Sequence, residues 1–184
     1  MKFTKALTLY AADLNNACKA ARVDTIAMVT RNLAELSVWV RYCNLSETYA
    51  RRFLEDSVRD FRELLETLHK LYTAENGKPE NAVTELLEGF YRVAAESGMR
   101  DVDERYIRVR DAAKEVTAPD AFNYTYKIFS KLAHPTSLVL TFDPEMGAFE
   151  TMVSAVYVNG VNLAISTFNE LVGFVHKSFE CPPV

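Results

Sequence analysis

The sequence predicts an all-α protein: a bundle of about six or seven helices with a hydrophobic central helix and a long C-terminal helix. Apolar residues recur at spacings of three and four in nearly every segment of the 184-residue chain, as in helices buried on one side. Glycine, which helix interiors disfavour, occurs only six times. No strand pattern extends beyond residues 137–142. We therefore expect a single helical domain over residues 1–184, with 180–184 as a flexible tail.

The central helix is expected at residues 26–43, because this stretch is apolar around most of its circumference. The stripe that faces the core is predicted to be Ile26, Val29, Leu33, Leu36, Val40 and Cys43. Further apolar surface comes from Met28, Ala34, Val38 and Trp39. The helix should therefore be enclosed by neighbours on most sides.

Helices are also expected before and after the central one. The first runs from about residue 3 to 21, and Asp24 is expected to cap the central helix. Ser46 should cap a third helix that extends to about Thr73. The outer face of this third helix is predicted to be solvated, because it carries charged pairs four residues apart: Arg51–Glu55, Arg52–Asp56, Arg59–Glu63 and Arg62–Glu66.

Turn and capping residues divide the middle of the chain into three further helices. Gly98 is expected to end the fourth helix in the left-handed conformation. A fifth helix is predicted to begin at Asp101, and a sixth to follow Thr117. The sixth helix should end at His134, because Pro135 disfavours helical geometry in the residue before it.

The last helix is expected at residues 147–179, and its composition raises the question of a membrane span. Glu170 is the only charged residue between Met152 and Val175. Three asparagines and several hydroxyl side chains make the stretch too polar for a good hydrocarbon-spanning helix. We therefore predict no membrane contact, but a buried helix or one half of a dimer interface. Gly160 should mark a kink or a close helix crossing.

Charge and cysteine content narrow the classes of function. A formal net charge of −4 argues against broad electrostatic binding to nucleic acid or to an anionic membrane, so only a local basic patch could serve. The three cysteines, Cys18, Cys43 and Cys181, lack the paired spacing of a zinc or redox site. No cleavage site follows an adequate apolar run near the N-terminus. We expect a cytoplasmic protein with reduced thiols.

Two histidine patterns are compatible with a metal, and neither is complete in the sequence. Glu66-x-x-His69 is a ligand pair used in di-iron bundles, but the second pair that such a site needs is missing. His69, His134 and His176 lie on three predicted helices, and three imidazoles can hold one zinc ion. Their spacing does not show that they converge. The prediction is therefore no metal and no cofactor.

Two polar groups form the candidate ligand-binding site. Arg31 and Glu35 lie one turn apart on the central helix, where they either satisfy each other or bind a carboxylate or phosphate. Tyr126, Ser130 and His134 form a hydrogen-bonding stripe on the sixth helix. His134 either caps the helix end or acts as a general base or phosphate contact. We expect Arg31 and Glu35 to be largely buried and connected to this stripe.

These two segments, RNLAE at residues 31–35 and YKIFSKLAHPT at 126–136, resemble bacterial all-helical families of unknown function that we associate with the HEPN superfamily. HEPN ribonucleases are helical dimers of abortive-infection or toxin systems, with an arginine a short distance before a histidine. At the corresponding spacing before His134 this sequence has Lys127. A lysine can contact phosphate, but it lacks the guanidinium fork of arginine.

Two functional hypotheses follow. The leading one is a non-catalytic binding or interaction module, in which Arg31, Glu35, Tyr126, Ser130 and His134 line a pocket for an unknown small molecule or protein partner. The alternative, implied by the resemblance, is a divergent HEPN-like ribonuclease or toxin component acting on RNA, with His134 and Lys127 as catalytic candidates. In either case we expect a homodimer through the last helix, whose apolar circumference exceeds what one buried face needs.

Overall fold

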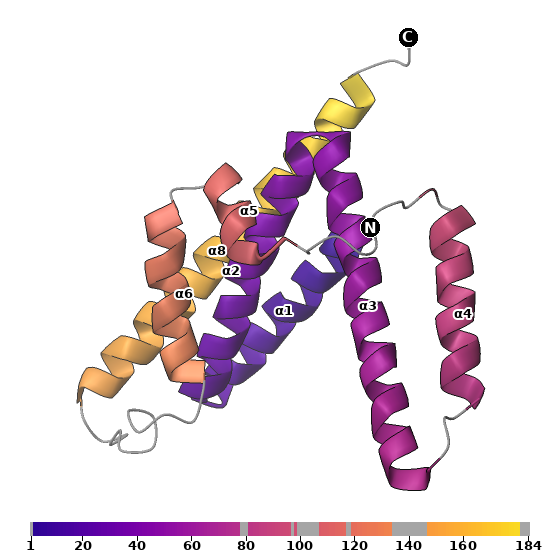
Figure 1. Ribbon diagram of the computed structural model, residues 1–184. Helices are drawn as coiled ribbons and strands as arrows, with labels where there is room; N and C mark the ends of the chain where they lie inside the picture. Colours follow the sequence, from indigo (N-terminus) through magenta and orange to yellow (C-terminus); the bar gives the residue numbers. More distant parts are fainter. Residues whose placement is uncertain are drawn as a thin grey trace. The chain divides into compact units, whose positions relative to one another are not determined.

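The computed structural model describes residues 2–77, 81–96, 98, 107–116, 119–133 and 147–180. The helices in this part of the chain are α1 (Lys2–Lys19), α2 (Val23–Leu45), α3 (Glu47–Asn76), α4 (Asn81–Glu96), α5 (Val109–Val116), α6 (Pro119–Ala133) and α8 (Gly147–Glu180) (Figure 1). No strand occurs among these residues, and the prediction of an all-α bundle is confirmed.

The helices divide into two compact units. Unit 1 consists of Met1–Leu45 together with Val109–Val184, and unit 2 consists of Ser46–Arg108. The larger unit therefore contains both ends of the chain, and the smaller one is a continuous segment between α2 and α5. That the whole chain forms one domain stays a prediction.

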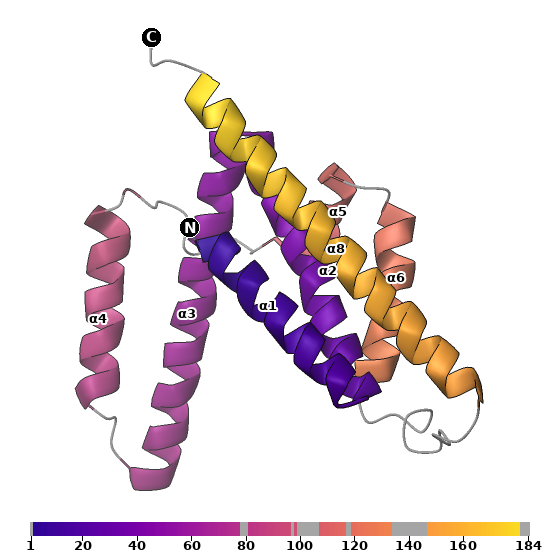
Figure 2. The ribbon, with the colours of Figure 1, turned by 180° about the vertical axis from the view of Figure 1, so that it is seen from behind.

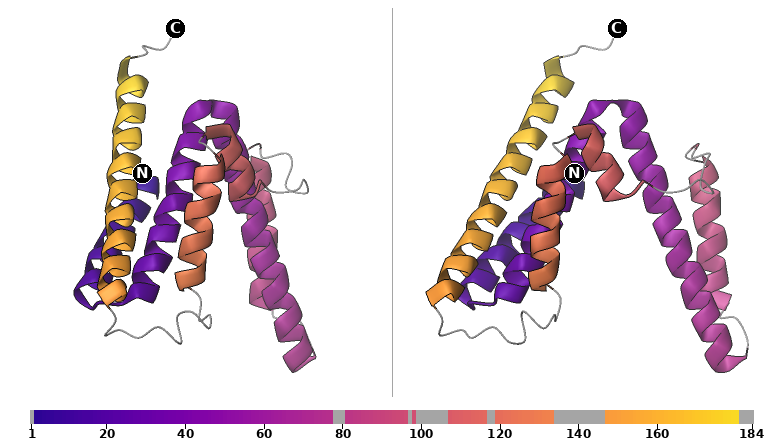
Figure 3. Two further views of the ribbon diagram at one scale, coloured as in Figure 1. Left: turned by 90° about the vertical axis from the view of Figure 1, so that its left-hand side faces the viewer. Right: turned by 60° about the vertical axis from the view of Figure 1, so that its left-hand side comes forward.

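The core of unit 1 is built around α2. Helices α1, α5, α6 and α8 all pack against it. Figure 2 shows α8 lying across α2, with α1 on one side and α6 on the other, and Figure 3 shows the same four helices from two further directions. The predicted stripe is buried at Ile26, Val29, Leu33, Leu36 and Val40. Burying a side chain of this size stabilises the fold by roughly 1.5–3 kcal/mol. The five buried residues of this stripe therefore make α2 a major contributor to the stability of unit 1.

Two details of α2 differ from the sequence-based prediction. Met28 is 48% exposed, so the helix is not enclosed there, although Ala34 and Val38 are buried. The helix begins at Val23, which places Asp24 in the first turn instead of at the N-cap. Its carboxylate accepts hydrogen bonds from Nε and Nη2 of Arg22 at 3.0 and 2.7 Å, and these bonds lower the pKa of Asp24. A carboxylate in the first turn also interacts favourably with the helix dipole.

Gly160 lies where α8 crosses its neighbours in unit 1. A Cβ atom at this position would lie 2.6 Å from Oγ1 of Thr30 on α2 and 2.8 Å from Cδ2 of Leu14 on α1. Thr30 is completely buried, and its hydroxyl donates to the carbonyl of Val156 at 3.4 Å. Of the two roles considered for Gly160, the structure supports the close crossing, because no larger residue fits without displacing its neighbours.

Unit 2 contains the hairpin of α3 and α4. Ser46 caps α3 as predicted, since its side chain accepts from the N–H of Tyr49. The helix extends past Thr73 to Asn76 and ends at Gly77, whose φ is 68°. Gly98 is also left-handed, at φ 67°, as predicted. The rings of Phe61 and Phe90 lie 5.0 Å apart between centroids and join the two helices. The predicted start of the fifth helix at Asp101 lies outside the described residues.

The outer face of α3 is not solvated throughout, and the prediction is wrong at Asp56 and Arg59. Both side chains are buried, and Nη1 of Arg59 donates to Asp56. The backbone N–H of Ile107 donates to the other oxygen of Asp56 at 3.1 Å, so a later part of the chain covers this face. Burial raises the pKa of Asp56, against the opposing effects of Ile107 and Arg59. The more exposed ion pairs of α3 are Glu47–Arg51 and Arg62–Glu66.

Candidate functional site

Arg31 of α2 and Tyr126 of α6 meet in unit 1. The guanidinium carbon of Arg31 lies 4.5 Å from the centroid of the Tyr126 ring, and Nη2 donates to the Tyr126 hydroxyl. Nε of the same side chain donates to Oε1 of Glu35 at 3.3 Å. The structure thus brings together three of the five residues expected at the site. The ring and the carboxylate together hold the guanidinium in one orientation.

The Arg31–Glu35 pair is less buried than expected. The side chains are 26% and 30% exposed, whereas the sequence predicted that both would be largely buried. Long charged side chains can cover apolar surface with their stems while their charged ends stay in contact with water. The helical pattern locates the stem of Arg31 but not its terminal group. The cluster is therefore accessible from solvent.

A second arginine, which the sequence analysis did not identify, lies beside the same ring. The guanidinium carbon of Arg110 on α5 is 6.0 Å from the Tyr126 ring centroid, and the residue is exposed. Two neighbouring small residues, Ala112 and Ala113, are fully buried and allow α5 to pack closely against α2. The pair of adjacent alanines is the one feature of the sequence that indicates close packing of α5. It does not show which helix α5 packs against.

We call the group formed by Arg31, Glu35, Arg110 and Tyr126 the Tyr126 cluster. It carries two positive charges and one negative charge, and its residues come from α2, α5 and α6. The ring of Phe122 packs on Tyr126 from one turn earlier, with 5.5 Å between centroids. The cluster therefore has a rigid aromatic base and a net positive charge of one within an acidic protein.

Ser130 and Lys127, the other described candidates, are on α6 but do not belong to the Tyr126 cluster. Ser130 lies one turn after Tyr126, and its buried hydroxyl has no hydrogen-bond partner among the described residues. His134 lies outside the described residues, so its role as base or cap stays a prediction. Lys127 is exposed and lines a groove between α6 and α8. The structure does not bring it to Arg31.

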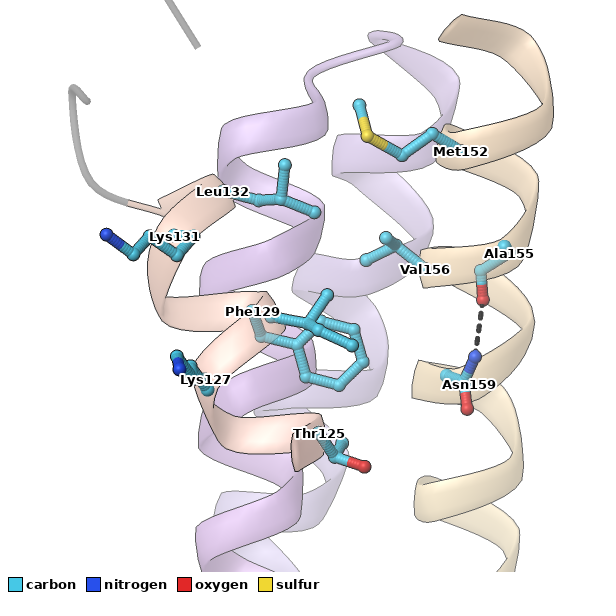
Figure 4. Close-up of a pocket in the computed structure, with 10 residues that line it drawn as sticks. Thr125, Lys127, Phe129, Lys131, Leu132, Met152, Ala155, Val156 and Asn159 are labelled. Atoms are coloured by element: carbon cyan, nitrogen blue, oxygen red, sulfur yellow. Dashed lines mark hydrogen bonds between the residues drawn. The ribbon is translucent and has the colours of Figure 1, made fainter. Parts of the chain in front are cut away.

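This groove has a volume of about 540 Å³. Its walls are largely apolar, with Phe129 and Leu132 from α6 facing Met152 and Val156 from α8 (Figure 4). Figure 4 also shows that the side chain of Lys131 points away from α8. The groove is therefore an apolar surface feature, and none of the residues of the Tyr126 cluster lines it.

The metal hypotheses involve residues on several helices. In the part of the chain that the structure describes, no group of three or more His, Cys, Asp or Glu side chains could hold a metal ion. Glu66, from the di-iron pattern, pairs with Arg62 at 3.7 Å. His134 and the side chain of His176 are not described, so convergence of the three histidines stays untested.

One described helix could cross a membrane by length and composition. It is the stretch Glu150–Val175 of α8, and core helices of soluble proteins pass the same criterion. The prediction of no membrane contact therefore stays a prediction.

Comparison with known proteins gives one match. The model of a protein family described as a family of unknown function (DUF5677) matches residues 3–147. No curated protein and no solved structure matches the chain. The matched region contains all four residues of the Tyr126 cluster and ends where α8 begins. The family description names no activity and no link to the HEPN superfamily.

Proposed function

The chain belongs to the DUF5677 family of unknown function, and we propose that it is a non-catalytic binding module whose Tyr126 cluster holds an anionic group. One observation carries the proposal: guanidinium groups from two helices lie 4.5 and 6.0 Å from the centroid of one tyrosine ring. Glu35 pairs with Arg31 inside the cluster, and the four residues together carry a net positive charge of one. The excess positive charge favours an anion at this place.

The chemistry of the cluster suits a carboxylate or a phosphate group. A guanidinium presents its donors in a planar fork that matches both groups, and such charge-assisted bonds are stronger than neutral ones. Glu35 and Tyr126 restrain Arg31 before any ligand arrives, which reduces the entropy lost on binding. The anion is carried by a small molecule or by an acidic segment of a protein partner. We further propose a cytoplasmic location, supported by the unpaired spacing of the cysteines.

Titration with inorganic phosphate tests this proposal without knowledge of the natural ligand. The Nε–H resonances of the arginines, followed by NMR, should shift saturably for Arg31 as phosphate is added. Replacing Arg110 by Ala should weaken the apparent affinity several-fold, because one of the two positive charges is lost. Arg52→Ala, an exposed change on α3, is the matched control. Equal phosphate responses in the wild type, Arg110→Ala and an Arg31→Lys variant would refute anion binding at the cluster.

The alternative proposal is a divergent HEPN-like ribonuclease. It is supported by the resemblance of residues 31–35 and 126–136 and by the two arginines beside Tyr126, which are suited to RNA phosphates. Incubation of the purified protein with single-stranded RNA tests it. Cleavage that disappears in His134→Ala and weakens in Lys127→Ala would support the nuclease. Intact RNA at stoichiometric concentrations of the wild-type protein would exclude it under those conditions and leave the binding module.

A further inference from the structure

Helix α8 carries two distinct apolar rows. The first faces the core of unit 1 and includes Val156, Gly160 and Thr167, all of which are buried. The second lies more than a quarter turn away around the helix. It consists of Val158, Val161, Ile165, Phe168, Val172 and Val175. We call this second row the outer row of α8.

The outer row has the spacing of a coiled-coil seam. Its members are separated alternately by three and four residues, which is the a and d pattern of a heptad repeat. The residues at one of the two positions, Val158, Ile165 and Val172, are all β-branched, as is favoured at a positions of two-stranded coiled coils. Single apolar side chains are commonly exposed on protein surfaces, but that does not account for six of them in a regular row.

Most of the outer row is exposed on a helix that is already folded. Five of its six side chains are between 38% and 56% exposed, and only Val161 is partly covered by the core. From Val158 to Val175 the row extends about 26 Å along the helix, at 1.5 Å per residue. In proteins, most of the stability of a helix comes from the packing of one face rather than from helix propensity. Here the packing of α8 on α1 and α2 has already met the cost of helix formation.

The outer row itself contains no charged residue that would repel an identical row. Its polar neighbours include Asn162 and Asn169, which are neutral. Glu170, the only charged residue between Met152 and Val175, has its carboxylate 3.3 Å from Nε of Arg41 on α2. Nη2 of the same arginine donates to the hydroxyl of Ser166 at 2.9 Å. The one charge of this stretch is thus neutralised within the unit.

We propose that the outer row of α8 pairs with the same row of a second copy, giving a homodimer through a two-helix seam. The occupant is a second copy because the row is regular in heptad spacing, apolar and without charge, so that it is complementary to itself. The interface lies outside residues 3–147, so the family match does not supply it. It is also independent of anion binding at the Tyr126 cluster.

Sedimentation velocity of the full chain at about 10 μM tests the pairing. The wild type should sediment as a dimer, and the double variant Ile165→Glu/Phe168→Glu should be a monomer, with at least a tenfold loss of affinity, because four carboxylates would face one another across the seam. Asn159→Glu adds a charge to an exposed position of α8 outside the row, and it should remain a dimer. Circular dichroism must show the same helicity for all three proteins.

A charge-pair experiment covers the case in which the double variant fails to fold. Ile165→Glu and Ile165→Lys should each be monomeric alone and should form a dimer when mixed. A monomeric wild type would overturn the proposal, as would equal dissociation of Asn159→Glu and the double variant. A wild type that is monomeric in buffer but floats with phosphatidylcholine vesicles would show that the row contacts lipid and would also overturn it.

Discussion

Arg31 illustrates how several modest contacts combine at a partly exposed residue. Its guanidinium stacks on Tyr126, donates to the tyrosine hydroxyl and pairs with Glu35. Water competes with these contacts, because about a quarter of the Arg31 side chain is exposed. Solvent also screens charge interactions strongly. The energetic effect should therefore be well below that of a fully buried pair.

Replacing Arg31 by Ala should lower the free energy of unfolding by about 1–2 kcal/mol. This range combines a partly screened hydrogen bond with a cation–π contact of about 0.5–1 kcal/mol. Chemical denaturation measures it, with Arg92→Ala, an exposed change on α4, as a control that should change little. A loss of more than about 3 kcal/mol would indicate the uncompensated charge expected of a buried pair and would contradict the observed exposure.

Cys43 should be unreactive toward thiol reagents in the folded protein. Burial raises the pKa of its thiol to about 11, so at pH 8 about one molecule in a thousand carries the reactive thiolate. Alkylation, followed by mass spectrometry in a Cys18→Ser/Cys181→Ser background, should be slow at pH 8 and should accelerate as the pH rises.

The same variant unfolded in guanidinium chloride provides the reference for Cys43, because its thiol then has a pKa of about 8.5. Equal rates for the folded and unfolded protein at pH 8 would contradict the effect of burial.

Part of the Tyr126 cluster could be predicted from the sequence, for a geometric reason. Arg31 and Glu35 share one helix face, so their pairing follows from a spacing of four. The contact with Tyr126 was expected because the central helix was predicted to offer Arg31 and Glu35 little solvated surface, although both side chains are partly exposed. Arg110 could not be found in this way, since its proximity depends on how α5 packs against α2 and α6.

At the scale of the helices, the core-facing stripes were predictable and the opposite faces were not. The period of α2 identifies the residues that form the core of unit 1, because burial selects apolar side chains at that period. The period of α3 shows equally well which face is charged. It contains no information on whether another segment covers that face, and Ile107 does so at Asp56.

Gly160→Ala should destabilise the protein by about 1–3 kcal/mol, the usual cost of forcing extra volume into a packed core. The added Cβ would lie 2.6 Å from Oγ1 of Thr30, a side chain that is completely buried and whose hydroxyl is bonded to Val156. Thermal unfolding compared with the wild type measures the effect.

Gly173→Ala is the matched control on the same helix. No atom lies within 4 Å of its added Cβ, so the higher helix propensity of alanine should stabilise the protein by up to about 1 kcal/mol. Opposite signs for the two substitutions are expected. Stabilisation by both would show that α8 does not cross α1 and α2 closely at residue 160.

At the scale of the whole molecule, the main core cluster belongs entirely to unit 1. Its buried members come from α1, α2, α6 and α8, and none comes from residues 46–108. Helical periodicity gave no sign of this division, because α3 has the same amphipathic pattern as the helices of unit 1. Which helices share a core is a property of the tertiary packing, and local spacing does not encode it.

Unit 1 should fold without unit 2. We expect a chain in which residues 46–108 are replaced by a flexible glycine–serine linker of about a dozen residues to keep its helicity and a cooperative thermal transition. Circular dichroism at increasing temperature measures both. A non-cooperative, gradual loss of signal would show that the core of unit 1 requires residues 46–108.

The division of unit 1 along the chain has a consequence for synthesis on the ribosome. Its core joins Leu7 to Val156, so the apolar face of α2 cannot be completely covered until α8 has been made. Unit 2 is continuous and is synthesised completely while α2 still lacks its later partners α5, α6 and α8. Domains generally fold as units during translation, and exposed apolar surface favours aggregation. Nascent chains that end before α8 should therefore be the species that depend most on chaperones.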